Sequence, residues 1–426
     1  MLTALIVIFV LAYGAIALEH PLGVNKSASA LIGAGLLWTL HALSLGDPAA
    51  VTGQLAESLT GTAQIVFFLM GAMAIVELVD AHNGFDVVTR RIRSRSLSSL
   101  LWLVGAVTFF LSAILDNLTT TIVMISLMRK LLAKAEDRLR FAGIIVIAAN
   151  AGGAWSPIGD VTTTMLWIGG QVSALATMGS VILPSLVSLL LPLALTAWSL
   201  RGQPFAAAPL PTEASNTTTA FERQLMFGLG LGVLVAVPAF KTITHLPPFL
   251  GVLFGLGILW LAGDLVHRKK DEEQRQPLTL AHALSRIDMS SLLFFVGILL
   301  AVAVLEHSHV LAALAAWLDQ TIGRLDVIAL VIGVASAVVD NVPLVAASMG
   351  MYPLADYPTD HLLWGFLAYC AGTGGSILIM GSAAGVAAMG LEKIRFFWYV
   401  RHVSGLALLG YLAGAAVFLL QRAWLG

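Results

Sequence analysis

An Asp-Asn pair occurs twice in this chain, each time within a long apolar stretch. Asp116-Asn117 ends the segment SAILDN, and Asp340-Asn341 ends the segment SAVVDN 224 residues further along. An ionisable side chain within a membrane is costly and marks a functional site by default. Asp-Asn pairs also cap helices, but recurrence at matched positions favours a functional role. The sequence therefore predicts that both pairs belong to a site for cations or protons.

A third acid, Asp160, stands at a predicted break in a helix. It ends the segment NAGGAWSPIGD at 150–160, whose Gly and Pro residues stop a helix and leave backbone carbonyl groups unpaired. At membrane depth such groups are tolerated only where they face a cavity or an ion. The second half has a matching segment, GTGG at 372–375, which lies 222 residues after NAGG. Close helix packing is the alternative reason for these glycines, and the repeated match favours a break.

Oxygen-bearing side chains accompany the three acids. Such ligands suit hard cations, whereas soft metals prefer thiolate or imidazole, and neither His nor Cys clusters here. Burial in a low dielectric disfavours the charged form of a carboxyl group, so a buried acid holds a proton or releases it to bind a cation. A cation and a proton would then compete for one site, which is the chemistry of antiport. The predicted cation- and proton-binding residues are Ser112, Asp116, Asn117, Thr120, Asn150, Asp160, Thr162, Ser336, Asp340, Asn341, Thr373 and Ser376.

The composition places this chemistry in a membrane. The 426 residues are 58% hydrophobic and only 11% charged, with a mean hydropathy of +0.90, whereas soluble proteins are about 25% charged. A soluble enzyme is excluded, and a net charge of −1 offers no basic surface to a nucleic acid. The apolar runs are too long for barrel strands, so we predict an all-α polytopic membrane protein. The predicted spans are 2–18, 28–45, 63–79, 180–200, 225–243, 250–266, 289–305 and 403–420.

The stretch 97–128 is too long for one span. Its 32 residues would form a helix of about 48 Å, against about 30 Å of hydrocarbon. Basic clusters flank it on both sides, at 90–95 and 129–140, and such clusters stay in the cytoplasm. We therefore predict a re-entrant hairpin with Asp116-Asn117 at its tip, the turn between its two helices. One long tilted helix is the alternative.

This topology accounts for the basic residues of the whole chain. It puts 20 of the 23 Lys and Arg residues on the cytoplasmic side, Lys26 among them, and only Lys241, Arg324 and Arg422 fall outside. A wrong number of spans would scatter these residues over both sides. Both chain ends are predicted to lie outside.

The two halves are predicted to be inverted repeats. Acidic residues flank the second hairpin, so it enters from the outer side, opposite to the first. Inverted repeats whose broken helices meet at the membrane midplane are the architecture of secondary transporters. The predicted organisation is N-terminal transmembrane helices at 1–62, a first repeat at 63–200 with hairpin 97–128 and broken helix 141–178, a cytoplasmic linker at 201–223, a second repeat at 224–402 with hairpin 327–351 and broken helix 361–389, and a C-terminal helix at 403–426.

Four segments resemble the NhaD-type sodium/proton antiporters of the ion transporter superfamily. They are SAILDNLTTTIVM at 112–124, NAGGAWSPIGDVTTTMLW at 150–167, SAVVDNVPLVAASMGMY at 336–352 and GTGGSILIMGSAAGVAAMG at 372–390. The resemblance implies a carrier in a bacterial inner membrane that exports Na+, and also Li+, in exchange for entering protons and so serves pH and salt homeostasis. It also implies a homodimer of chains with scaffold and transport domains, surrounded by lipid. No bound cofactor is expected.

The resemblance carries over to polar positions of this chain. Na+ is expected at Asp116, Asn117, Asp160 and Asn341. The halves differ, because Asn150 and Asp160 match Gly372 and Ser382 of the second copy. We therefore expect the first half to dominate ion binding.

One other transport function stays open from the sequence. Na+-coupled carriers of dicarboxylates or other organic anions in the same superfamily resemble this chain in hairpins and broken helices, but their tips are typically neutral Ser-Asn-Thr. Asp116, Asp160 and Asp340 would repel an anion unless cations neutralise them. An intramembrane aspartyl protease would need Gly-x-Gly-Asp, and PIGD at 157–160 lacks its first Gly, so we expect no enzyme.

Overall fold

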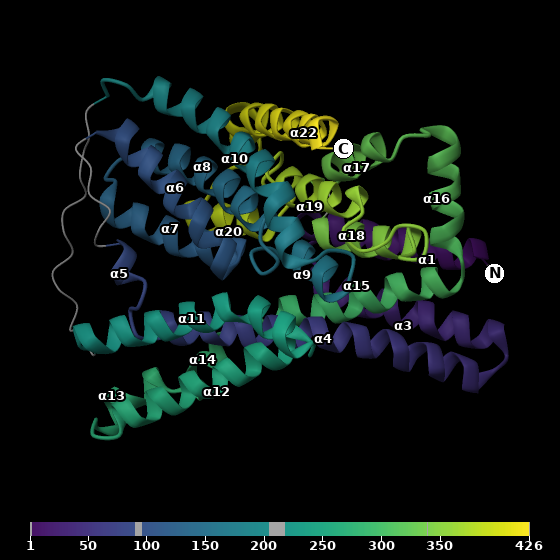
Figure 1. Cartoon of the computed structure of the whole chain (residues 1–426), viewed down its shortest axis with the longest axis horizontal. Coiled ribbons are helices and arrows are strands. Elements are labelled where there is room, and N and C mark those ends of the chain that lie inside the picture. Colours follow the sequence, from purple (N-terminus) through teal and green to yellow (C-terminus); the bar gives the residue numbers. More distant parts are fainter. Residues whose placement is uncertain (1, 90–95, 204–217, 339, 426) are drawn as a thin grey trace.

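The protein is helical throughout the residues that the structure, a computed structural model, describes: 2–89, 96–203, 218–338 and 340–425. No β-strand occurs in these residues, and the predicted all-α fold is confirmed (Figure 1). The helices of the first half are α1 (Leu2–Ala17), α2 (Glu19–Leu22), α3 (Lys26–Leu45), α4 (Pro48–Ala81), α5 (Asp86–Thr89), α6 (Leu97–Leu115), α7 (Asn117–Leu131), α8 (Ala135–Ala154), α9 (Val161–Ile168) and α10 (Ala174–Ser199). Those of the second half are α11 (Ala220–Thr244), α12 (Pro248–His267), α13 (Glu272–Arg275), the 3-10 turn η1 (Gln276–Leu278), α14 (Leu280–Arg286), α15 (Met289–His307), α16 (Val310–Thr321), α17 (Leu325–Ala335), α18 (Asn341–Met351), α19 (Leu362–Gly374), α20 (Ala383–Glu392), α21 (Phe396–Tyr399), the π-turn η2 (Val400–Ser404) and α22 (Gly405–Leu425).

Eight described helices are long and apolar enough to cross a membrane: α3, α4, α6, α10, α11, α12, α15 and the run Phe396–Trp424. The chain is therefore a multi-pass membrane protein. The first predicted span, 2–18, corresponds to the shorter α1. Helix α4 has 34 residues, so the predicted boundary at residue 62 falls inside one helix. This helix begins early because Asp47 accepts hydrogen bonds from the first free N–H groups and Pro48 suits a first helical turn.

Both predicted hairpins are pairs of helices. Helices α6 and α7 meet at Asp116, and α17 and α18 flank Asp340. The predicted bounds, 97–128 and 327–351, lie within three residues of the observed helix ends. The basic cluster at 90–95, which supported the first hairpin, lies outside the described residues, as does most of the predicted linker 201–223, whose last four residues begin α11.

Both predicted helix breaks occur, between α8 and α9 and between α19 and α20. The first predicted broken helix, 141–178, is too long, because α9 ends at Ile168 and residues from Ala174 onward belong to α10. Gly170 lies between them with a φ of +85°, a backbone conformation that glycine adopts without steric cost. The second broken helix, predicted at 361–389, extends to Glu392.

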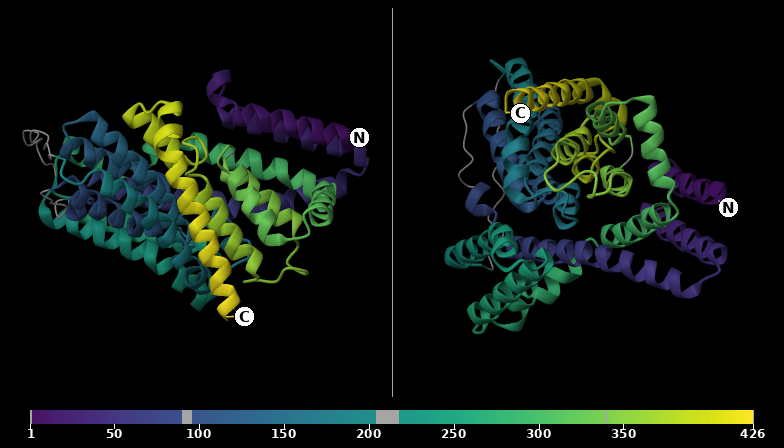
Figure 2. Two further views of the ribbon diagram at one scale, coloured as in Figure 1. Left: turned by 90° about the horizontal axis from the view of Figure 1, so that it is seen from above. Right: turned by 45° about the vertical axis from the view of Figure 1, so that its right-hand side comes forward.

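The two halves pack on one another in the same manner. Helices α1 and α3 pack together and against α15, while α11 and α12 pack together and against α4. The views from two sides agree: α1 and α3 lie near the N-terminal end of the molecule, and α11 and α12 lie at the opposite end (Figure 2). The N-terminal helices therefore have counterparts in the second half.

The repeat extends to single backbone contacts. A Cβ added to Gly159 would lie 2.7 Å from the carbonyl oxygen of Ser112, and one added to Gly381 would lie 2.8 Å from that of Ser336. Real Cβ atoms do not approach oxygen this closely, so both positions require glycine. In each half, the break in the helix is thus held directly against the hairpin.

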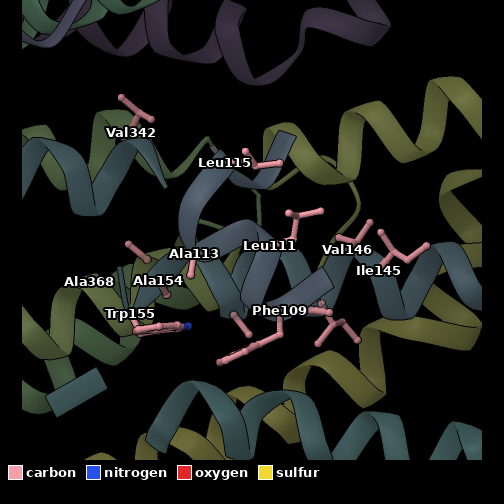
Figure 3. Close-up of a cluster of buried hydrophobic side chains, with 14 of the residues drawn as sticks. Phe109, Leu111, Ala113, Leu115, Ile145, Val146, Ala154, Trp155, Val342 and Ala368 are labelled. Atoms are coloured by element: carbon pink, nitrogen blue, oxygen red, sulfur yellow. The ribbon is translucent and has the colours of Figure 1, made fainter. Parts of the chain in front are cut away.

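Apolar side chains fix the first hairpin to the broken helices. The rings of Phe109 in α6 and Trp155 at the first break stack with centroids 6.0 Å apart. Figure 3 shows this pair beside Ala368 of α19, with Val342 of α18 above it. Residues from both halves therefore share one core around the breaks.

A pair of histidines joins the ends of α4 and α12. The Nε2 atoms of His82 and His267 lie 2.8 Å apart, and Nδ1 of His82 donates to the Leu78 carbonyl oxygen at 2.6 Å. His82 therefore bonds both to the backbone of α4 and to the ring of His267. Glu222 and Lys270 form an ion pair of 2.8 Å beside His267.

The His82–His267 pair is expected to make the stability of the folded protein depend on pH. Burial, the largest effect, lowers the pKa of the His82 imidazole, so its contribution is present above the unfolded pKa of about 6.5 and is lost as the pH falls. We expect the unfolding temperature to fall between neutral and mildly acidic pH, and His82→Gln to flatten that dependence. A thiol-reactive dye reports unfolding well here, because Cys370 is the only cysteine of the chain and is buried. An unchanged slope in the variant would contradict this role.

Candidate functional site

Asp160 is the centre of the site. Its side chain does not cap α9 and is 2% exposed. Its Oδ2 accepts hydrogen bonds from Thr162 Oγ1 at 2.7 Å and Asn341 Nδ2 at 3.3 Å, and its Oδ1 accepts from Asn117 Nδ2 at 3.2 Å. Both hairpins therefore donate to one carboxylate of the first broken helix.

Asn150 extends these contacts to the second broken helix. Its Oδ1 accepts from Asn117 Nδ2 at 3.1 Å, and its Nδ2 donates to Ser376 Oγ at 2.9 Å and Ser382 Oγ at 2.8 Å. Elements from both halves thus meet in one buried set of side chains. We call this set the polar network: Asn117, Asn150, Asp160, Thr162, Asn341, Ser376 and Ser382.

Asp116 lies beside the polar network and also caps a helix. Its carboxylate accepts from the backbone N–H of Thr119 at 2.7 Å and from the Thr119 hydroxyl at 2.8 Å. Its φ is +121°, a conformation that costs about 1–3 kcal/mol for a residue other than glycine. Asn117 follows it directly and donates to Asp160, so Asp116 is one residue away from the polar network along the chain.

The Thr120 hydroxyl is buried without a hydrogen-bond partner among the described residues. Such a group normally has one, because an unpaired buried hydroxyl costs about 1–3 kcal/mol. A bound cation would give it a partner.

Three other predicted residues use their hydroxyl groups to hold the backbone. Ser112 donates to the Ala149 carbonyl oxygen at 2.6 Å and thereby joins the first hairpin to α8. Ser336 lies within hydrogen-bonding distance of the Ala371 carbonyl oxygen, at 3.3 Å, and Thr373 donates within its own helix. The oxygen atoms of these side chains keep lone pairs, but the structure does not bring them into the polar network.

Asp340 is paired with a lysine. Its Oδ2 lies 2.7 Å from Nζ of Lys26, the first residue of α3, and its Oδ1 accepts from the Val342 N–H at 3.3 Å. Lys26 is therefore not a free basic residue of a loop, because its ammonium is bound to the second hairpin. The residues around it lie against the start of α15, where Asn25 and Ser27 contact Ser290.

Two residues that contact the predicted site residues are not among those predicted from the sequence. Lys26 is the only Lys or Arg in the first 89 residues, and this isolation was the available signal. Ser382 was noted only as the counterpart of Asp160, yet it bonds to Asn150. Its place at the second break was the signal for a role in the site.

The arrangement suits a small hard cation. The polar network offers carboxylate, amide and hydroxyl oxygens, and no ion pair in the described chain involves Asp116 or Asp160. A positive charge is therefore missing at two enclosed carboxylates. Na+ or protons can supply it.

The chain is similar to known membrane transporters. The profile of the CitMHS family, described as citrate transporter, matches residues 5–372. Sodium/proton antiporter 1 of Arabidopsis thaliana is 51% identical over 416 residues, which cover 98% of this chain and 72% of that protein. The Na+/H+ antiporter NhaD of Alkalimonas amylolytica is 31% identical over 446 residues, with 97% of this chain and 89% of that protein covered.

A solved structure shares the fold. The YdaH transporter of Alcanivorax borkumensis, whose topology is described as unusual, matches with a TM-score of 0.58 and 14% sequence identity. The match covers 94% of this chain and 98% of that one. Similarity at this level of identity supports the arrangement of helices and says nothing of the cargo.

Proposed function

Because the chain belongs to the NhaD-type sodium/proton antiporters within the CitMHS transporter family, we propose that it exchanges cytoplasmic Na+ for external H+ by alternating access. As a member of this family it is a cation/proton antiporter and not an enzyme. Li+, which has the same charge and a smaller radius, is the second proposed cargo.

The observation that carries this proposal is the set of bonds around Asp160. Its carboxylate accepts from both hairpins and from its own helix start, and it has no basic partner in the described chain. Na+ would bind here with Asp116, the Thr120 hydroxyl, and the amide oxygens of Asn117 and Asn341, once the amides turn from donating to coordinating. Protons would occupy the same carboxylates in the other half of the cycle.

An organic-anion carrier is the second candidate, because the family profile is described as a citrate transporter. A multiply charged anion needs a counter-charge in a low-dielectric site. No Lys or Arg side chain bonds to the polar network in the part of the chain described, and Lys26 is already paired with Asp340. The charge of the site therefore favours a cation.

A cavity supports access from the outer side. It has a volume of about 260 Å³ and lies between helices α4 and α15 on one side and α9 and α18 on the other. Glu57, Glu306 and His307 are in its lining. Acidic groups of this kind would attract cations into the cavity.

The setting of this exchange is also a proposal. Relatives named NhaD are bacterial, which supports the bacterial inner membrane, whereas an Arabidopsis relative with higher identity makes a plant membrane the competing location. A homodimer is proposed with the family, and no cofactor is needed for the exchange.

Asp116→Asn is expected to reduce exchange at least about tenfold, because one carboxylate fewer weakens cation binding by about 1.4 kcal/mol or more. Asparagine is as good a helix cap as aspartate, so the fold is retained. The assay uses everted membrane vesicles with a preformed pH gradient, in which Na+ and Li+ are expected to collapse the gradient while K+, succinate and citrate are compared beside them.

Asp47→Asn is the matched control. Asp47 caps α4 in the same manner as Asp116 caps α7, but it is exposed and far along the chain from the site. It should exchange Na+ at the wild-type rate. Collapse of the gradient by citrate and not by Na+ alone would refute the antiport proposal.

A further inference from the structure

Lys26 places a fixed positive charge at the second hairpin tip. Its Nζ lies 2.7 Å from Asp340 Oδ2 and 4.4 Å from the centroid of the Phe294 ring. The two charged side chains are 24% and 15% exposed. A pair this enclosed is screened little by water or salt. The ammonium therefore offsets the charge of Asp340 with little dependence on salt.

The first hairpin tip has no such charge. Asp116, the counterpart of Asp340 in the repeat, accepts hydrogen bonds from Thr119 and takes part in no ion pair of the described chain. Both tips nevertheless serve one site, because the asparagine after each acid donates to Asp160. The two hairpin tips thus have matching backbones but differ in charge, since only Asp340 has a basic partner.

We propose that Lys26 is a built-in cation of the ion site, whose ammonium fills at Asp340 the place that a transported cation takes in the first half. The inference rests on the proposed function and adds to it. Three carboxylates and one ammonium leave two negative charges, on Asp116 and Asp160. The site then presents two uncompensated carboxylates instead of three to Na+ and protons.

Na+ binding to the purified chain tests this role, measured by radioactive sodium or by calorimetry at alkaline pH. Asp340→Asn leaves an uncompensated ammonium beside Asn341, and repulsion at short range in a low dielectric should weaken Na+ binding at least about tenfold. Lys26→Met combined with Asp340→Asn should restore the dissociation constant to within about threefold of the wild type, since loss of both partners leaves no buried charge unpaired. Lys26→Arg keeps the charge and should bind Na+ as the wild type does.

The outcomes separate this inference from the proposed function. A double variant as weak as Asp340→Asn, or an Asp340→Asn variant with wild-type affinity, would overturn the role of Lys26. A folded wild type that binds no Na+ would overturn antiport itself, and the inference with it. Lys393→Met removes one positive charge from an exposed position and should leave Na+ binding unchanged.

Discussion

Replacing Asp160 by asparagine is expected to abolish Na+-driven proton exchange, with a loss of at least about 100-fold. Two tenfold steps correspond to about 2.7 kcal/mol, which is the scale of one or two charge-assisted contacts. The neutral amide offers one acceptor oxygen, while Asn117, Thr162 and Asn341 all donate to this position. The variant therefore loses the charge that attracts the cation and also an acceptor on which both hairpins depend.

Proton release gives a second measurement of the same substitution. If Na+ and H+ compete for Asp160, addition of Na+ to weakly buffered wild-type protein releases protons, and Asp160→Asn releases none. Asp264→Asn is the control, because Asp264 is a half-exposed carboxylate near the end of α12. Its exchange and proton release should match those of the wild type. Full proton release by Asp160→Asn would show that another acid carries the exchanged proton.

The internal sequence repeat made the two hairpins and the two helix breaks predictable. The segments that end in Asp116-Asn117 and Asp340-Asn341 mark the starts of α7 and α18. Helices end there and at 150–160 for local reasons, namely capping side chains, Gly and Pro. Local signals of this kind can be read from sequence. The structure places the starts of α7, α9, α18 and α20 around one site.

The polar network was only partly predictable. Six of its seven members were expected from their residue types and from the family resemblance, but which oxygen each one faces depends on packing between segments far apart in the chain. Lys26 shows the limit, since it pairs with a residue 314 positions away. The positive-inside rule treats a lysine between two spans as a loop residue and has no means of seeing such a partner.

The start of α4 was missed for a different reason. Residues 49–62 contain Thr, Gln, Glu and Ser, so they are less apolar than the predicted span 63–79. The Asp-Pro pair at 47–48 is a helix start signal, and the Ala and Leu residues that follow favour helix. Capping at Asp47 and Pro48 starts the helix before the apolar run, so α4 is longer than the predicted span.

Gly152→Ala is expected to have the second large effect, a loss of most folded protein. A Cβ at this position would collide with the carbonyl group of Phe109 in α6, and backbone atoms cannot turn aside as a side chain can. Helix α6 would have to move away from α8 and separate the stacked rings of Phe109 and Trp155. Forced overpacking costs about 1–3 kcal/mol and occasionally more, which lowers both the unfolding temperature and the yield of monodisperse protein.

The same prediction applies to the matching glycine of the second half, Gly374. Gly374 meets the carbonyl group of Gly333 as Gly152 meets that of Phe109, so Gly374→Ala should destabilise the fold to a similar extent. Gly179 lies inside α10 with nothing near its Cβ position, and Gly179→Ala should stabilise by up to about 1 kcal/mol, because alanine favours helix. Loss of stability in all three variants would point to a general need for glycine in these helices. Loss in Gly152→Ala and Gly374→Ala alone ties stability to the two crossings that hold the hairpins against the broken helices, and so ties the geometry around Asp160 to the repeat.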